Sequence, residues 1–301
     1  MEQLLAIWRR MGIEYRTDCP LSEHSSFGIG GNAALAVFAR ERASLLGAVS
    51  ALRGKGIPFW VIGNGSNVVF PDEGFGGAVI FTAGQNQIRV EGTQMCVGAG
   101  ASLTAISLAA RDASLSGAAF AYGIPGTLGG AVFMNAGAFG GCMADICVSS
   151  EYYDRETDTV GSFAGEVQEF GTRTSVYAGT DRYVILGARL QLASGDRAQI
   201  TADMEDFMAR RKSTQPLEYP SAGSVFKRPV GRFAGKLIED CGLKGLTVGG
   251  AQVSQKHAGF IVNVGGATAR DVRTLVERIR DTVLQRTGVE LECEIRFLGS
   301  E

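Results

Sequence analysis

The sequence contains only two histidines, His24 and His257, and its six cysteines are scattered without a C-x-x-C pair. The chain therefore offers few side chains for a histidine-rich metal site, a zinc-binding cysteine cluster or a Ser–His–Asp triad, and no metal is expected. The cysteines are expected to be free thiols in a reducing cytosol. They are Cys19, Cys96, Cys142, Cys147, Cys241 and Cys293.

An excess of positive charge is also lacking, since 29 Lys and Arg stand against 31 Asp and Glu. A protein dedicated to nucleic acid would show a basic face or tail, so no nucleic-acid partner is expected. Proline is scarce, with seven residues, whereas the hydrophobic content of 45% allows a sizeable buried core. Glycine is abundant, with 42 residues, which indicates tight turns and close approach of the backbone to a ligand.

Long hydrophobic runs suited to a membrane are missing. The stretch between Asp112 and Asp145 carries no charge, but its eight glycines, Pro125 and Asn135 would break a spanning helix several times. The arginines near the N-terminus follow the short apolar run, which is the reverse of a signal peptide. We therefore expect a cytoplasmic protein without membrane insertion.

Two periodicities are mixed along the chain. The 3.6-residue period predicts helices at 41–55, 103–113 behind a Ser102 N-cap, 201–211 and 268–286. Runs rich in β-branched and aromatic residues predict strands at 58–62, 78–81, 94–97, 148–153, 183–192, 259–264 and 291–298. Because the mixture shows no strict βαβ rhythm, the fold class is predicted to be α+β. A shift in composition near residue 195 predicts a domain boundary.

Three glycine-rich segments are candidates for a nucleotide site. Residues 28–33 partly match G-x-G-x-x-A, but no buried strand precedes them and no acidic residue follows at the Rossmann spacing, which favours a turn in a non-Rossmann site. The predicted strand 58–62 runs into 63–67, a turn that would present consecutive N–H groups to a phosphate. Residues 123–130 are compatible equally with a ligand site and with plain turns between strands.

Several motifs, in order through nearly the whole chain, carry a resemblance to a known family. They lie at residues 25–31, 62–67, 123–130, 135–138, 218–227, 250–263 and 291–297. On these motifs the chain resembles the UDP-N-acetylenolpyruvoylglucosamine reductases, also called UDP-N-acetylmuramate dehydrogenases, which are flavoenzymes of peptidoglycan precursor synthesis. Its compact length resembles the shorter form of that family.

The resemblance implies an FAD-binding fold of the vanillyl-alcohol-oxidase type over 21–195, in two subdomains of about 21–80 and 81–195. An N-terminal helix in 1–20 would precede it, and an α+β substrate-binding domain in 196–301 would follow. The cofactors implied are non-covalent FAD and NADPH as hydride donor. The FAD-binding residues implied are Gly63, Asn64, Gly65, Ser66, Asn67, Gly123, Ile124, Pro125, Gly126, Thr127, Gly129, Gly130 and Gly137.

The resemblance also implies a catalytic set of Arg173, Ser224 and Glu294. Hydride addition to an enolpyruvyl C=C moves negative charge toward the neighbouring carboxylate, which Arg173 can grip with two N–H groups. Ser224 would then donate a proton, and Glu294 would polarise its hydroxyl. Glu292 alternates with Glu294 in the same run, and only the resemblance separates the two. Thr172 departs from the family pattern, which commonly has tyrosine before the arginine.

Further implied substrate contacts are Tyr219, Lys227, Gln252, Lys256 and Asn263. Arg210, Arg211 and Lys212 close a predicted helix, where a diphosphate-binding role and a helix-dipole role are equally open. His257 is expected to orient or pack rather than to catalyse. The partners expected are a UDP-sugar and NADPH, and the protein is expected to be a monomer.

Two alternatives remain open at this point. One is another flavin oxidoreductase of the same fold that acts on a different alcohol or ether. The other is a non-catalytic protein that binds nucleotides or sugars. A purified protein that stays colourless after addition of FAD would favour the second alternative, because both flavoenzyme hypotheses require bound flavin.

Overall fold

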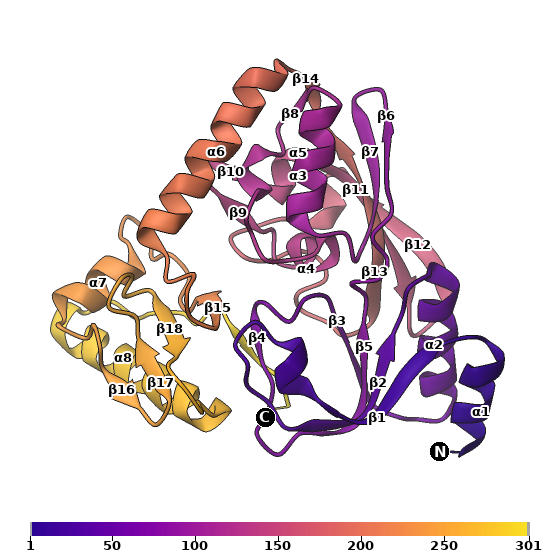
Figure 1. Cartoon of the computed structure of the whole chain (residues 1–301), viewed down its shortest axis with the longest axis horizontal. Helices are drawn as coiled ribbons and strands as arrows, with labels where there is room; N and C mark the ends of the chain where they lie inside the picture. Colours follow the sequence, from indigo (N-terminus) through magenta and orange to yellow (C-terminus); the bar gives the residue numbers. More distant parts are fainter. Residues whose placement is uncertain (1, 300–301) are drawn as a thin grey trace. The chain divides into compact units, whose positions relative to one another are not determined.

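The computed structural model describes residues 2–299 (Figure 1). The chain consists of two compact units. The first unit contains Met1–Thr17, Leu35–Asn64 and Gly77–Arg210, and the second contains Asp18–Ala34, Gly65–Gly76 and Arg211–Glu301. The domain division predicted from the sequence, 1–20, 21–195 and 196–301, stays a prediction.

Helices and strands are mixed along the chain, which confirms the predicted α+β class. The helices are α1 (Glu2–Arg10), α2 (Arg42–Gly54), α3 (Leu103–Asp112), α4 (Leu128–Phe133), α5 (Met143–Ile146), α6 (Arg197–Thr214), α7 (Ala234–Asp240) and α8 (Ala269–Thr287). Short 3-10 helices lie at Leu21–His24, Ala119–Ala121 and Gly165–Gln168. The first strands are β1 (Glu14–Pro20), β2 (Asn32–Phe38), β3 (Phe59–Ile62), β4 (Val68–Val69), β5 (Phe75–Phe81), β6 (Ile88–Glu91), β7 (Gln94–Gly98), β8 (Leu115–Ser116), β9 (Gly137–Ala138) and β10 (Gly141–Cys142). The others are β11 (Cys147–Asp154), β12 (Thr159–Ala164), β13 (Tyr183–Gln191), β14 (Ala193–Ser194), β15 (Ser221–Ser224), β16 (Thr247–Val248), β17 (Ala251–Val253), β18 (Phe260–Asn263) and β19 (Arg296–Phe297).

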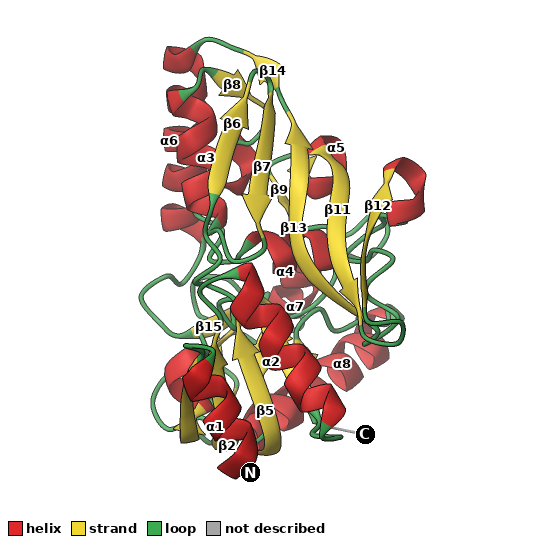
Figure 2. Ribbon diagram, turned by 90° about the vertical axis from the view of Figure 1, so that its right-hand side faces the viewer, coloured by secondary structure: helices red, strands yellow, loops and turns green. Residues whose placement is uncertain are grey.

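The largest sheet of the first unit is antiparallel, with strand order β12-β11-β13-β7-β6 (Figure 2). Glu151 pairs with Gly187 while Tyr152 pairs with Ile185, so Leu186 is an extra residue in β13. Such a bulge reverses the alternation of side chains along a strand. As a result β13 contributes Leu190 to one hydrophobic core of the unit and Leu186 to the other.

A second sheet has the order β1-β2-β5-β3, and its strands β3 and β5 run parallel. Within the first unit, Ile80 of β5 shares a hydrophobic core with Trp8 of α1 and with Leu45 and Leu52 of α2. The predicted helix at 41–55 is therefore confirmed, because its apolar face is the one that this core buries. The strand β3 ends at Ile62, directly before the glycine-rich turn that begins at Gly63.

The second unit contains a sheet of order β15-β18-β17-β16 whose hydrophobic core includes the apolar stripe of α8. Thr268 accepts a hydrogen bond from Asp271 N (3.0 Å), and the Asp271 carboxylate accepts one from Thr268 N (3.0 Å). This capping box starts α8 where the sequence predicts it. The predicted N-cap Ser102 likewise accepts a hydrogen bond from Ala105 N (3.1 Å) and begins α3.

The predicted strand at 291–298 is wrong over most of its length. Only β19 forms there, parallel to β4, together with a single bridge between Cys293 and Phe226. The first half of the segment bonds antiparallel to the residues after β15, while the second half bonds parallel to β4. Because its two halves pair with different neighbours, the segment cannot form one continuous strand.

Within residues 2–299, no helix combines the length and the hydropathy that crossing a bilayer requires. The same residues contain no group of three or more His, Cys, Asp or Glu side chains arranged to hold a metal ion.

Candidate cofactor and active site

Two of the predicted cofactor segments touch each other in the first unit although they lie about sixty residues apart in sequence. A Cβ added to Gly63 would lie 2.1 Å from Thr127 Oγ1, so only glycine fits at this position. Next to it, Asn64 Nδ2 donates a hydrogen bond to the carbonyl of Pro125 (3.4 Å). The end of β3 is thereby joined to the turn that precedes α4.

Several backbone amides of these segments have no acceptor among the described residues. Those of residues 63–66 donate to no acceptor among residues 2–299, and the same holds for Gly126, Thr127 and Gly130. The amides of Leu128 and Gly129 differ, because they donate to Ala101 O and Ala99 O and so fix the segment in place. Amides left unpaired in glycine-rich turns are the usual partners of phosphate oxygens.

The remaining part of the first segment, Gly65 to Asn67, belongs to the second unit. Gly65 has φ +59°, and a Cβ on it would lie 2.3 Å from His24 O, so both its conformation and its surroundings require glycine. Asn67 Nδ2 donates to Glu294 O (3.2 Å). This hydrogen bond connects a predicted cofactor residue to the segment that carries a predicted catalytic residue.

The residues present fit a phosphate-bearing cofactor such as FAD. Besides the unpaired amides, Gly130 lies exposed in α4, and a Cβ added to it would meet no atom within 4 Å. Neighbouring protein atoms leave room only for glycine at Gly63 and Gly65, whereas no described protein atom restricts the side chain at Gly130 in this way. The open space at Gly130 is the feature expected of a glycine that a ligand approaches closely.

Arg173 occupies a strained position in a tight turn of the first unit. A hydrogen bond from Gly171 N to Thr174 O (3.1 Å) closes the turn, and Arg173 has φ +57°. A non-glycine residue in this left-handed region costs about 1–2 kcal/mol. Arg173 Nη1 and Nη2 donate to Asn135 O (3.5 Å) and Gly137 O (3.3 Å). The predicted catalytic arginine therefore contacts the predicted cofactor residue Gly137.

Ser224 and Glu294 lie close together in the second unit. Ser224 is exposed at the end of β15, where it pairs with Phe260 of β18. The next residue, Val225, accepts a hydrogen bond at its carbonyl from Glu294 N (2.7 Å). The backbone of the half-buried Glu294 thus lies beside Val225, and polarisation of the Ser224 hydroxyl by its carboxylate stays a prediction.

Glu292, which alternates with Glu294 in the same run, has its own side-chain and backbone partners. Glu292 is exposed and its carboxylate is ion-paired with the Lys227 ammonium group. In addition, Lys227 N donates to Glu292 O (2.8 Å). Glu292 therefore already has a partner, and this partner is one of the predicted substrate contacts.

The other predicted substrate contacts differ in how they are engaged. Tyr219 is 46% exposed, while Gln252 Nε2 donates to Thr247 Oγ1 (3.0 Å). Lys256 Nζ donates to Lys212 O (2.7 Å), at the C-terminal turn of α6. Asn263 donates to Phe27 O (3.1 Å) and accepts from the amides after it, so its side chain supports the second unit itself.

Of the remaining charged candidates, Arg210 and His257 have structural partners. Arg210 forms an ion pair with Asp206 (2.8 Å) one turn earlier in α6, and Arg211 is only 6% exposed. His257 Nδ1 accepts a hydrogen bond from Gly259 N (3.1 Å), and burial lowers the pKa of its imidazole. These contacts agree with the expectation that His257 packs and orients.

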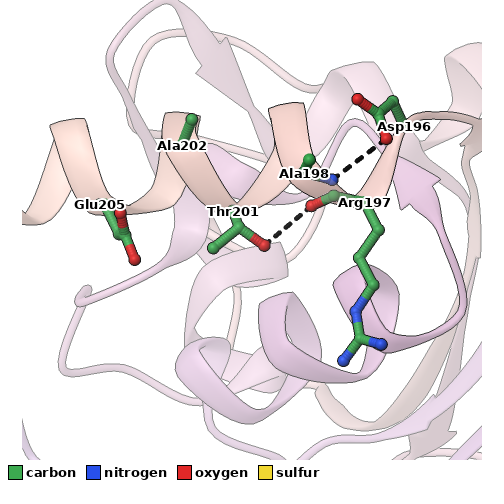
Figure 3. Close-up of a pocket in the computed structure, with 6 residues that line it drawn as sticks. All are labelled: Asp196, Arg197, Ala198, Thr201, Ala202 and Glu205. Atoms are coloured by element: carbon green, nitrogen blue, oxygen red, sulfur yellow. Dashed lines mark hydrogen bonds between the residues drawn. The ribbon is translucent and has the colours of Figure 1, made fainter.

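A shallow hollow along the start of α6 contains none of the predicted site residues (Figure 3). Asp196 Oδ1 accepts from Ala198 N (3.2 Å), and Thr201 Oγ1 donates to Arg197 O (2.8 Å). Arg197 Nη2 also donates to Asp112 Oδ1 of α3 (2.9 Å). These polar groups serve the protein structure, and the hollow is not a candidate active site.

Asn135 is a residue of the site region that the sequence analysis did not select. It is 8% exposed, and its side chain bonds to both the Arg173 turn and the start of α5. The sequence offers only its place in the 135–138 motif, and nothing in that motif indicates which distant turn it reaches.

Comparison with known proteins gives consistent matches along the chain. Residues 33–162 match the model of an FAD-binding domain, and residues 215–298 match that of the UDP-N-acetylenolpyruvoylglucosamine reductase C-terminal domain. UDP-N-acetylenolpyruvoylglucosamine reductase of Clostridium perfringens strain 13 is 42% identical over 306 residues, covering 100% of both chains. That of Clostridioides difficile is 43% identical over 289 residues, covering 96% of this chain and 94% of its own.

A solved structure is also similar to this chain. The crystal structure of UDP-N-acetylenolpyruvylglucosamine reductase (MurB) from Thermus caldophilus matches with a TM-score of 0.79 and 35% identity. The match covers 95% of this chain and 98% of the other. The expected FAD-binding fold is confirmed.

Proposed function

Because this chain belongs to the family of UDP-N-acetylenolpyruvoylglucosamine reductases, we propose that Arg173, Ser224 and Glu294 carry out its reaction. The enzyme is an FAD-dependent oxidoreductase that uses NADPH to reduce UDP-N-acetylenolpyruvoylglucosamine to UDP-N-acetylmuramate, in peptidoglycan precursor synthesis. When bound, FAD supplies hydride transfer from NADPH to the enolpyruvyl group. The residues proposed to hold it are those of the two glycine segments and Gly137.

The proposed role of Arg173 is to stabilise the charge that develops on the substrate carboxylate. Its guanidinium is always charged and offers two parallel donors, which match a carboxylate. A cation held in advance at this position stabilises the transition state more than the ground state. The observation that carries the proposal is the strained turn that holds Arg173 against Gly137, since such strain accumulates at functional sites.

The proposed role of Ser224 is to give a proton to the carbon next to the carboxylate. Serine alone is a weak acid and needs a polarising neighbour. Glu294, whose backbone bonds to the residue after Ser224, is the proposed neighbour. Tyr219, Lys227, Gln252, Lys256 and Asn263 are proposed to contact the UDP-sugar. Lys227 would have to share its ammonium group with Glu292.

The decisive experiment separates the two half-reactions of the Ser224→Ala enzyme by anaerobic rapid mixing. Reduction of the flavin by NADPH should stay near wild type, because it requires no proton on the sugar. Reoxidation by the enolpyruvyl sugar should slow by roughly 10²- to 10⁴-fold, the usual contribution of a positioned general acid. Ser224→Cys should recover part of this rate, since a thiol is the stronger acid.

Ser221→Ala is the matched control, because Ser221 lies on the same strand three residues earlier. It should leave both half-reactions unchanged. If the Ser224→Ala enzyme reoxidises as fast as wild type, Ser224 is not the proton donor. A purified protein that does not take up FAD would contradict the whole assignment.

We also propose that the enzyme works as a cytoplasmic monomer and, through peptidoglycan, supports cell shape and division. The nucleotide-bearing substrate and NADPH support a cytoplasmic location, because both are metabolites of that compartment. Light scattering coupled to size-exclusion chromatography tests the oligomeric state. Depletion of the protein in its own cells tests the effect on cell shape.

A further inference from the structure

We infer that Asn135 is a positioning residue for Arg173, and this inference rests on the proposed role of Arg173. Asn135 Nδ2 donates to Gly171 O (2.9 Å), the first residue of the Arg173 turn. The backbone carbonyl of the same asparagine accepts from Arg173 Nη1 (3.5 Å). One residue therefore holds both the turn from which Arg173 projects and the guanidinium at its end.

The orientation of the Asn135 amide is determined by its partners. Its Oδ1 accepts from Ala144 N (2.9 Å), so Nδ2 must be the end that faces the carbonyl of Gly171. The side chain is 8% exposed, and its backbone has φ +45°, a region that asparagine tolerates better than most residues. Both the side chain and the backbone shape at position 135 therefore suit asparagine in particular.

The turn needs such support because Arg173 itself is in the left-handed region. A second connection lies on the other side, where Ser175 Oγ donates to Phe133 O (2.7 Å). Ser175 thus attaches one end of the turn to the last residue of α4, and Asn135 attaches the other end to the segment that follows α4. Loss of the Asn135 amide removes one of these two attachments, so the turn and the guanidinium that it carries should be displaced.

The test uses the FAD-loaded enzyme and the Asn135→Gly variant, because glycine keeps the backbone conformation and the carbonyl while removing the amide. Reoxidation of reduced flavin by the enolpyruvyl sugar should slow by about 10- to 100-fold, the effect of a displacement near 1 Å. Reduction by NADPH should change less than twofold. Hydrogen exchange should become faster in residues 171–174.

The control for a merely structural effect is Ser107→Ala, which removes hydrogen bonds from a buried serine to Leu103 O and Ala118 O. It should lower the melting temperature while leaving both half-reactions unchanged. Asn135→Asp, which keeps the acceptor for Ala144 N but loses the donor to Gly171, is the second variant if Asn135→Gly does not fold. It should show the same selective slowing.

A double-mutant cycle with Arg173→Ala decides whether Asn135 acts through the arginine. Asn135→Gly should cause no further slowing in the Arg173→Ala background. Three results would each overturn the inference. They are multiplicative slowing by Asn135→Gly and Arg173→Ala in the double variant, equal slowing of both half-reactions by Asn135→Gly, and unchanged hydrogen exchange in residues 171–174. Normal reoxidation by Arg173→Ala alone would instead refute the proposed role of Arg173, and a slow Arg173→Ala with a normal Asn135→Gly would refute only the role of Asn135.

Discussion

Substitution of Gly130 by valine tests the cofactor site with little disturbance of the protein. Gly130 lies in α4 with a helical backbone, and an added Cβ would meet no atom within 4 Å. In a helix interior glycine is about 1 kcal/mol less favourable than alanine, and valine is at most about 0.7 kcal/mol less favourable. The folding free energy of the apoprotein should therefore change by only a few tenths of a kcal/mol.

The affinity for FAD should respond quite differently. If the open space at Gly130 is where the backbone meets the cofactor, an isopropyl group there obstructs it. We expect the dissociation constant of FAD to rise by at least about 10-fold, which corresponds to about 1.4 kcal/mol. Titration of the apoprotein with FAD, followed by flavin fluorescence, measures this constant, and a thermal melt of the apoprotein measures the folding effect.

Gly54→Val is the matched control, because Gly54 is also helical, exposed and open, at the end of α2. It should leave FAD affinity unchanged. An unchanged affinity in Gly130→Val would refute the assignment of this glycine to the cofactor site. A large loss of apoprotein stability would show that the added side chain collides with the protein instead.

Three further predictions concern the catalytic arginine, the contact between the glycine segments and the buried histidine. Arg173→Lys keeps the charge but has one nitrogen in place of the two that bond Asn135 O and Gly137 O. Reoxidation of the flavin by the sugar should slow by about 10-fold or more, while reduction by NADPH stays unchanged. Equal slowing of both half-reactions would indicate a structural role, and Arg89→Lys, at an exposed arginine, is the control. Gly63→Ala should destabilise the protein by about 1–3 kcal/mol through overpacking against Thr127. In urea unfolding, Thr127→Ala in the same chain should recover part of this loss, because it removes the Oγ1 that would lie 2.1 Å from the new Cβ. Strictly additive effects would show that the two residues do not touch. Burial lowers the pKa of His257 below its ordinary 6.5, so the unfolded chain binds this proton more readily and stability should fall as pH drops below about 6.5. In the His257→Gln variant, the urea midpoint should change less with pH between 5.5 and 7.5 than in wild type. An identical pH dependence of the two midpoints would contradict the shift.

The sequence alone determined the elements whose stabilisation is local. The α8 capping box and apolar stripe lie within a few residues of one another, so the pattern predicts both the start of the helix and its buried face. The glycine segments were also recognisable, because a turn that approaches a ligand closely requires glycine wherever it lies. Glu294 could be selected only by resemblance, since alternation treats Glu292 in the same way.

Only the tertiary structure decided the features that depend on partners distant in sequence. The segment 291–298 failed to form the predicted strand because its halves bond to Val225 and to Val69, which no local pattern reveals. The bulge at Leu186 arises from pairing with β11, and it allows one strand to serve two cores. The turn that carries Arg173 is likewise held by a hydrogen bond from Asn135, which lies 36 residues before Gly171. Hydrogen bonds between distant segments form only once the chain has folded, so they leave no periodic trace in the sequence.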